Sequence, residues 1–130
     1  MTKKPNCIIA ARLGSKRIKE KNIKKFNGLP MIVYSIRAAK KSKLFSNIYV
    51  STESEKIAKI ARNNGAIVPQ LRPKVLARDK TPIRDVVIDF VNKNGLNDTK
   101  YNFFIYPVSP LINPQDLIKA YNKIIKLKYD

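Results

Sequence analysis

Positively charged side chains crowd into one short segment, directly after a run of apolar residues. The apolar run is Cys7–Ala11, and seven cations follow it before Gly28: Arg12, Lys16, Arg17, Lys19, Lys21, Lys24 and Lys25. Anions bind where several cations and backbone N–H groups converge. Arg12 can hold a phosphate through two parallel hydrogen bonds, and Leu13-Gly14-Ser15 can turn tightly, which exposes N–H groups and the Ser15 hydroxyl. The segment therefore fits a polyphosphate site.

The residues alone leave two interpretations of this segment open. In the first, Lys16 and Lys21 add point charges to a cradle for a polyphosphate. In the second, the segment is a solvated, lysine-rich loop. Neither the P-loop pattern GxxxxGK(S/T) nor the dinucleotide pattern GxGxxG occurs in the chain, so the two commonest phosphate-binding motifs are excluded.

The elements that must position these cations follow from the apolar periodicity. Short, mostly apolar runs typical of a sheet covered on both faces predict strands at Cys7–Ala11, Asn47–Ser51, Ala66–Pro69 and Asn102–Tyr106. Helical spacing predicts helices at Pro30–Lys41, at Thr52–Asn64, from Thr81-Pro82, and from Asn113-Pro114 to Asp130. A capping box over Thr52–Glu55 and a left-handed stop at Gly65 delimit the second helix.

Alternation of strands and helices predicts an α/β fold, a three-layer α/β/α sandwich with a mostly parallel sheet. Ligands of such sheets bind outside the carboxyl ends of the strands. The loops at those ends are Arg12–Asn27, the turn after Ser51, Gln70–Thr81 and Pro107–Asn113. We expect a single nucleotide-binding domain over residues 1–130, with the basic segment at its ligand-binding edge.

Composition excludes several classes of protein. The 130 residues suit one domain, and a hydrophobic content of 44% excludes a disordered chain. No apolar run approaches the length of a membrane span, about 18 residues, so we expect a cytoplasmic protein without a membrane partner. Cys7 cannot form an internal disulfide, and no histidine is present to activate its thiol, so we interpret it as a core residue.

The net charge of +18 also has two interpretations. A nucleic acid or an anionic membrane would select such a charge. However, the chain has 20 Lys against 7 Arg, together with 17 Ile and 12 Asn, a bias typical of AT-rich coding. Because no helix-turn-helix, zinc site or aromatic RNA-binding strand is recognisable, we expect no nucleic-acid partner.

The string "ARLGSKRIKEKNIKKFNGLPMI" resembles the N-terminal signature of the acylneuraminate (nonulosonate) cytidylyltransferases, the CMP-sialic acid synthetases. The matching residues are Ala11, Arg12, Gly14, Ser15, Lys16, Ile18, Lys21, Asn22, Gly28, Pro30 and Met31. Later family segments resemble "IYVSTESEKIAKIARNNGAIVPQLRP", "LARDKTPIRDVV" and "YPVSPLINPQDL", in the same order. The resemblance covers all 130 residues as the N-terminal portion of the family and implies a nucleotide-diphospho-sugar transferase-like (Rossmann-like) fold.

The resemblance implies a reaction and a set of residues. In the family, the anomeric hydroxyl of a nine-carbon 2-keto sugar acid attacks the α-phosphorus of CTP, and pyrophosphate leaves. Arg12 and Lys21 would then be catalytic. CTP would be bound by Arg12, Ser15, Lys16, Arg17, Lys21, Asn22, Arg72 and Thr81, and the sugar by Tyr106 and Ser109.

Three of these residues also have an interpretation that involves no ligand. Arg17 would be solvated, Arg72 would be a surface arginine before Pro73, and Thr81 would be a helix cap. Many sialic acid enzymes carry Gln where this chain has Tyr106, so the sugar stays open among sialic, pseudaminic and legionaminic acid types.

Family members are longer than this chain, and their second half supplies the aspartates that bind Mg²⁺ and the arm that forms a homodimer. The resemblance therefore implies that the Mg²⁺ ligands lie beyond Asp130, and we interpret Glu53, Asp79 and Asp85 as helix-start, loop or surface groups. Other interpretations are an inactive truncated fragment, a basic nucleic-acid-binding domain, and a nucleotidyltransferase of the Kdo type. The Lys21-Asn22 pair argues against the last.

Overall fold

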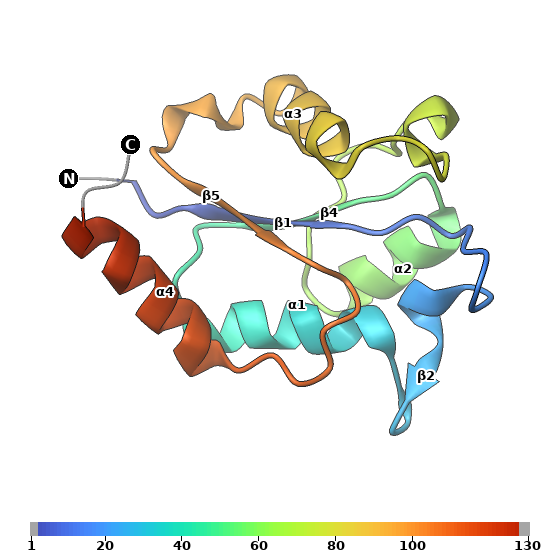
Figure 1. Ribbon diagram of the computed structural model, residues 1–130, viewed down its shortest axis with the longest axis horizontal. Coiled ribbons are helices and arrows are strands. Elements are labelled where there is room, and N and C mark those ends of the chain that lie inside the picture. The colour runs from blue at the N-terminus through green and yellow to red at the C-terminus, as the bar shows by residue number, and fades with distance from the viewer. Residues whose placement is uncertain (1–2, 128–130) are drawn as a thin grey trace.

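Three parallel strands form the centre of the computed structural model, which describes residues 3–127 (Figure 1). They are β1 (Asn6–Ala10), β4 (Ile48–Ser51) and β5 (Asn102–Ile105), and their order in the sheet is β4-β1-β5. Ile8 of the central strand stands in register with Tyr49 and Phe104. The expected parallel sheet is confirmed, with the first strand of the chain at its centre.

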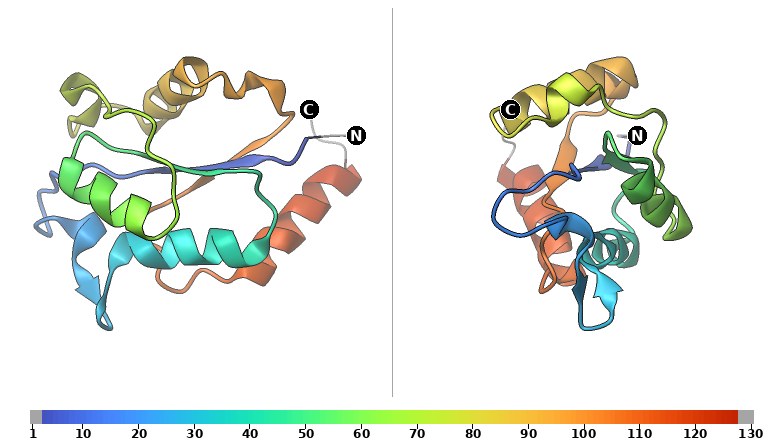
Figure 2. Two further views of the ribbon diagram at one scale, coloured as in Figure 1. Left: turned by 180° about the vertical axis from the view of Figure 1, so that it is seen from behind. Right: turned by 90° about the vertical axis from the view of Figure 1, so that its right-hand side faces the viewer.

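Helices cover both faces of this sheet, which confirms the three-layer sandwich (Figure 2). On one face lie α1 (Met31–Ser42), α2 (Glu55–Asn63) and α4 (Pro114–Leu127), and on the other lies α3 (Ile83–Lys93). Successive side chains of a strand point to opposite faces of the sheet, so β1 contributes core residues to both faces. Cys7 and Ile9 pack into the core with α1 and α2, whereas Ile8 packs against Phe90 of α3. Burial raises the pKa of the Cys7 thiol to about 12, as suits a core residue.

The expected strand Ala66–Pro69 is reduced to a single bridge, so that prediction is wrong. Ile67 pairs with Tyr49 through two backbone hydrogen bonds, Ile67 N–H to Ile48 O at 2.8 Å and Val50 N–H to Ile67 O at 2.9 Å. Alternate residues of a parallel strand bond the same neighbour, so the ladder would need a donor at Pro69 to continue; the Val68 carbonyl accepts from the Arg62 guanidinium at 3.0 Å. Pro69 has no N–H to donate.

The helix ends follow the sequence signals only in part. Gly65 has φ +89° and follows α2 as expected. Asn113 accepts from the Gln115 N–H at 2.8 Å at the start of α4. The capping box at Thr52 is wrong, because α2 begins at Glu55 with Ser54 as its cap, accepting from the Ile57 N–H. The expected end of the last helix at Asp130 lies outside the described residues.

A small antiparallel hairpin was not predicted. It joins β2 (Lys25–Phe26) to β3 (Leu29–Pro30) between the basic segment and α1. Its turn residues, Asn27 and Gly28, have φ of +48° and +87°, as two-residue hairpin turns require. Residues 3–127 also contain three 3₁₀ turns: η1 (Lys21–Ile23), η2 (Lys74–Ala77) and η3 (Leu96–Asp98).

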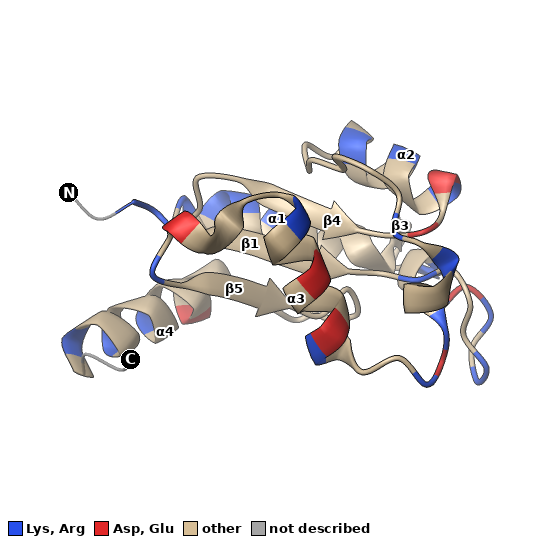
Figure 3. Cartoon of the chain, turned by 90° about the horizontal axis from the view of Figure 1, so that it is seen from above, with Lys and Arg blue, Asp and Glu red and all other residues tan. Residues whose placement is uncertain are grey.

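Lys and Arg are spread widely over the molecule, on α1, α2 and α4 as well as at the end where the basic segment lies (Figure 3). The total charge therefore does not point to one face. No helix in the described part of the chain is long and apolar enough to cross a membrane.

Candidate functional site

A pocket lies where the three strands end. Arg12, which follows β1, and Tyr106 and Pro107, which follow β5, line the pocket. The wall beyond β4 comes from the 70–81 segment and the start of α3. Its lining residues are Ala10, Arg12, Gly14, Ser15, Lys21, Asn22, Arg72, Leu76, Arg78, Asp79, Thr81, Ile83, Val86, Tyr106 and Pro107. The pocket lies outside the carboxyl ends of the strands, where ligands of such sheets usually bind.

Four of the seven cations of the basic segment lie in or beside this pocket. Arg12, Ser15 and Lys21 line the pocket itself, and the same three residues line an adjoining hollow with Lys16 and Arg17. These residues therefore line two adjoining hollows, although Lys16, Arg17 and Lys21 are exposed. The structure brings together every phosphate-binding candidate from this segment, and their roles stay predictions.

The segment is held in shape by polar anchors. The N–H of Leu13 donates to the Glu53 carboxylate at 2.6 Å, and the Asn22 side-chain amide donates to the Arg12 carbonyl at 2.8 Å. The Ser15 hydroxyl donates to the Ile18 carbonyl and accepts from the Lys21 N–H at 3.1 Å. The Leu13 N–H and the Ser15 hydroxyl therefore already have partners within the chain, and both groups stabilise the loop.

Arg72 is buried, only 8% exposed, so the interpretation as a surface arginine is wrong. Its guanidinium donates to the carbonyls of Leu76 and Ser51, each at 3.2 Å, and lies 3.8 Å from the Glu53 carboxylate. Burial lowers the pKa of Arg72, while Glu53 opposes that effect. These contacts fix Arg72 in the wall of the pocket.

Three buried atoms in and beside this wall lack hydrogen-bond partners among residues 3–127. They are the side-chain oxygen of Asn22, the Nε of Arg72 and one carboxylate oxygen of Glu53, which lies beside Arg72. Buried polar atoms are usually paired, and Asn22 and Arg72 line the pocket. Asn22 thus has one unpaired acceptor and Arg72 one unpaired donor, both shielded from solvent.

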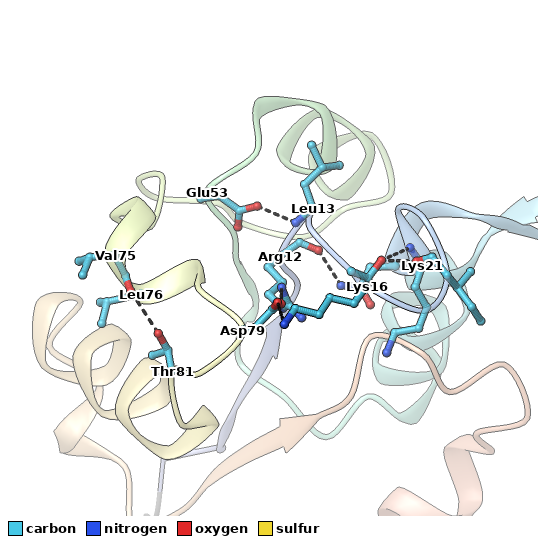
Figure 4. A network of polar contacts seen from close by, with 12 residues as sticks. Arg12, Leu13, Lys16, Lys21, Glu53, Val75, Leu76, Asp79 and Thr81 are labelled. Carbon is cyan, nitrogen blue, oxygen red and sulfur yellow. Dashed lines mark hydrogen bonds and ion pairs between the residues drawn. The ribbon is translucent and has the colours of Figure 1, made fainter.

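The 70–81 segment closes the pocket with both polar and apolar side chains. Thr81 donates to the Val75 carbonyl at 3.1 Å (Figure 4). It does not cap α3, whose N-cap is Pro82, so that alternative is wrong. Leu76, Ile83 and Val86 give this end an apolar surface. The pocket thus has a cationic end and a partly apolar end.

Asp79 lies in the pocket wall and contacts two cations of the basic segment. Its carboxylate is ion-paired with Arg12 and, at 3.2 Å, with Lys16, and Figure 4 shows the Arg12 and Asp79 side chains pointing toward each other. The hydrogen bond from Lys16, together with Arg12, lowers the pKa of Asp79, which is therefore charged at neutral pH. The other two acids differ, since Glu53 is a buried anchor and Asp85 lies on the surface of α3 beside Arg84.

The two expected sugar-binding residues occupy different places. Tyr106 lines the pocket, is 60% exposed and stacks edge-on against Phe104. Ser109 is not among the lining residues, and its carbonyl accepts from the Ile112 N–H at 3.1 Å.

Sequence reasoning missed several residues of the site. Arg78 and the apolar residues Leu76, Ile83 and Val86 line the pocket without having been assigned to it. The position of "LARDKTPIRDVV" after a strand end was the available signal. Glu53 carried no signal, because its partner Leu13 lies 40 residues away in the chain.

The described residues do not offer a set of Mg²⁺ ligands. Among residues 3–127, no three His, Cys, Asp or Glu side chains are grouped so that they could hold a metal ion. Asp79 is a carboxylate of the pocket, and it is already paired with two cations. Mg²⁺ prefers several oxygen ligands, so we derive no step through this ion.

Known proteins that match this chain include proteins named as cytidylyltransferases. The profile of the cytidylyltransferase family matches residues 6–130. A pseudaminic acid cytidylyltransferase from Campylobacter jejuni (strain 81-176) is 37% identical over 124 residues, which cover 92% of this chain and 53% of that protein. The N-acylneuraminate cytidylyltransferase A of Danio rerio is 38% identical over 125 residues, covering 96% and 28%.

A solved structure shares the fold. It is a CMP:2-keto-3-deoxy-manno-octonic acid synthetase complexed with CTP, which matches with a TM-score of 0.80 over 95% of this chain and 48% of that chain, at 19% identity. Identity this low shows the fold alone. The chain spans about half, or less, of the length of the curated relatives it matches.

Proposed function

This chain belongs to the cytidylyltransferase family, and we propose that it forms the CTP-binding part of an enzyme that makes CMP-activated nine-carbon 2-keto sugar acids. The reaction transfers CMP from CTP to the sugar and releases pyrophosphate. Relatives named for pseudaminic acid and N-acylneuraminate support this substrate class. The sialic, pseudaminic and legionaminic types all remain candidate sugars.

The observation that carries the proposal is the two-ended pocket at the carboxyl ends of the strands. Arg12, Lys16 and Lys21 supply positive charge at one end, which suits a triphosphate. Leu76 and Val86 give the pocket an apolar surface, which suits a nucleobase, and Asn22 and Arg72 line the same pocket with unpaired polar atoms. A nucleotide has the same polarity along its length.

The base end has the hydrogen-bonding groups that cytosine needs. Cytosine presents an amino group as donor and ring nitrogen and carbonyl groups as acceptors. The unpaired oxygen of Asn22 is an acceptor for the amino group, and the unpaired Nε of Arg72 is a donor for the acceptors. Thr81, whose hydroxyl donates to Val75, can still accept.

The cationic end has the charges that the reaction needs. The anomeric hydroxyl oxygen forms a bond to the α-phosphorus and gives up its proton, and the bond from that phosphorus to the bridging oxygen breaks. Negative charge then accumulates on the departing pyrophosphate. Arg12 and Lys21 would stabilise this charge because they are already in place before it develops. Lys16 and Arg17 would add weaker, exposed contacts.

Nucleotide titration of the full chain tests the proposal. We expect CTP to bind at least about tenfold more tightly than ATP or GTP, as one or two base-specific hydrogen bonds allow. Isothermal titration calorimetry measures the three dissociation constants. Equal affinity for all three nucleotides would contradict cytidine recognition, even if the phosphates bind. Product analysis with sialic, pseudaminic, legionaminic and Kdo-type acids would then identify the sugar.

A further inference from the structure

Asp79 sits where a bound anion would sit. Its carboxylate reaches the pocket from the 70–81 segment and contacts Arg12 and Lys16, two cations of the basic segment. Both partners come from a different part of the chain, 67 and 63 residues earlier. The contact therefore joins the two walls of the cationic end.

A carboxylate and a phosphate compete for the same donors. Both accept hydrogen bonds from guanidinium and ammonium groups in similar geometry. Arg12 has a half-buried side chain, 32% exposed, and its guanidinium contacts Asp79. A phosphate that binds both of these cations competes with Asp79 for the Nη1 group of Arg12 and the ammonium of Lys16.

We infer that Asp79 is an internal counter-anion that competes with polyphosphates for Arg12 and Lys16 and so sets how tightly the pocket holds them. This inference rests on the proposed function, since it concerns the same phosphate-binding end. The competition lowers the affinity for every anion that needs both cations. Weakly bound inorganic anions then fail to fill the site, and pyrophosphate leaves more readily after the reaction.

Removal of Asp79 has two opposite effects on phosphate binding: it ends the competition for the cations, and it loses their preorganisation. We expect the second effect to be smaller. Asp79 holds Arg12 and Lys16 near each other, so its removal frees their side chains. However, the segment itself is fixed by the Leu13–Glu53, Ser15–Lys21 and Asn22–Arg12 contacts, none of which involves Asp79. Removal of the carboxylate therefore mainly raises the positive potential of the pocket.

Substitution of Asp79 by Asn removes the charge and keeps the shape of the side chain. Asp89→Asn is a matched control, because Asp89 has 32% exposure against 31% for Asp79, pairs with Lys93 at 3.1 Å, and does not line the pocket. Tripolyphosphate, pyrophosphate, CTP and cytidine are titrated calorimetrically into the full chain and both variants, with EDTA and again with Mg²⁺.

We expect D79N to bind tripolyphosphate, pyrophosphate and CTP about three- to tenfold more tightly than the unmodified chain, as for the loss of partly exposed ion pairs. Cytidine, which has no phosphate, should be unaffected, and D89N should change nothing. A merely structural role for Asp79 would instead weaken all ligands together and lower the melting temperature.

Other outcomes would overturn the inference. Unchanged or weaker tripolyphosphate binding by D79N would do so, and weakening only with Mg²⁺ would make Asp79 a metal ligand instead. No tripolyphosphate binding by any variant would show that the cations form no anion site. Failure of the proposed function looks different: CTP then binds no better than ATP, while the effect of D79N on tripolyphosphate persists.

Discussion

Two basic regions of this molecule differ in what surrounds their charges. The first is the pocket at the strand ends, with Arg12, Lys16 and Lys21. The second, which we call the α1–α2 cleft, is lined by Arg37, Lys40, Lys41, Arg62, Asn63, Asn64 and Gly65. Both are hollows rich in cations, so charge alone does not distinguish them.

Burial and anchoring distinguish them. In the pocket, Asn22 and Arg72 are less than 10% exposed and leave polar atoms unpaired. In the α1–α2 cleft, the cations lie near the C-terminal ends of two helices, where positive charge offsets the helix dipole. Lys40 donates to the Asn64 carbonyl there, and Arg62 to that of Val68. Cations with such local roles need no ligand to explain them.

The largest expected effect concerns the anchors. Glu53→Ala removes a buried carboxylate that bonds the Leu13 N–H and lies beside Arg72, and it leaves the guanidinium uncompensated. We expect a loss of about 3 kcal/mol in the free energy of unfolding, as for the breaking of a buried ion pair. Urea denaturation followed by circular dichroism measures it.

Glu55→Ala is the control for that experiment. Glu55 also pairs with an arginine, Arg62 at 3.1 Å, but it is exposed, and its removal should cost about 0.5 kcal/mol or less. Similar losses for the two variants would remove the distinction between an anchored site and a solvated basic surface.

A somewhat smaller effect is expected for the cations. Arg12→Ala should weaken CTP binding about 30-fold, close to 2 kcal/mol, because a charge-assisted and partly buried contact is lost. Arg37→Ala, which removes the same side chain from the α1–α2 cleft, should change the dissociation constant less than about twofold, since a distant exposed charge is screened. Calorimetry compares the two variants, and equal losses would mean that only total charge matters.

The sequence was most informative about where strands end. Arg12 and Tyr106 meet at one pocket because each follows a parallel strand, and the carboxyl ends of such strands share an edge. The cationic segment and the buried strand β1 before it could both be located from local composition. The family signature added Arg72 and Thr81, which spacing alone did not place there.

Long-range polar contacts were beyond local patterns. The residues Thr52–Glu55 predict a capping box. In the structure, Glu53 contacts Leu13 and Arg72, and Ser54 caps the helix. The apolar run Ala66–Pro69 predicts a strand, but only Ile67 pairs, because Pro69 has no N–H to continue the ladder. The contact of Glu53 joins residues 40 positions apart, which no local window contains, whereas the effect of Pro69 is local.

A single titration shows which of the two basic regions binds CTP. CTP is added to the ¹⁵N-labelled chain, and the amide chemical shifts are followed by NMR. The account predicts shifts at Arg12, Lys21, Asn22 and Arg72, with Arg37, Lys40 and Arg62 unchanged. Shifts centred on the α1–α2 cleft, or equally distributed over both regions, would contradict it.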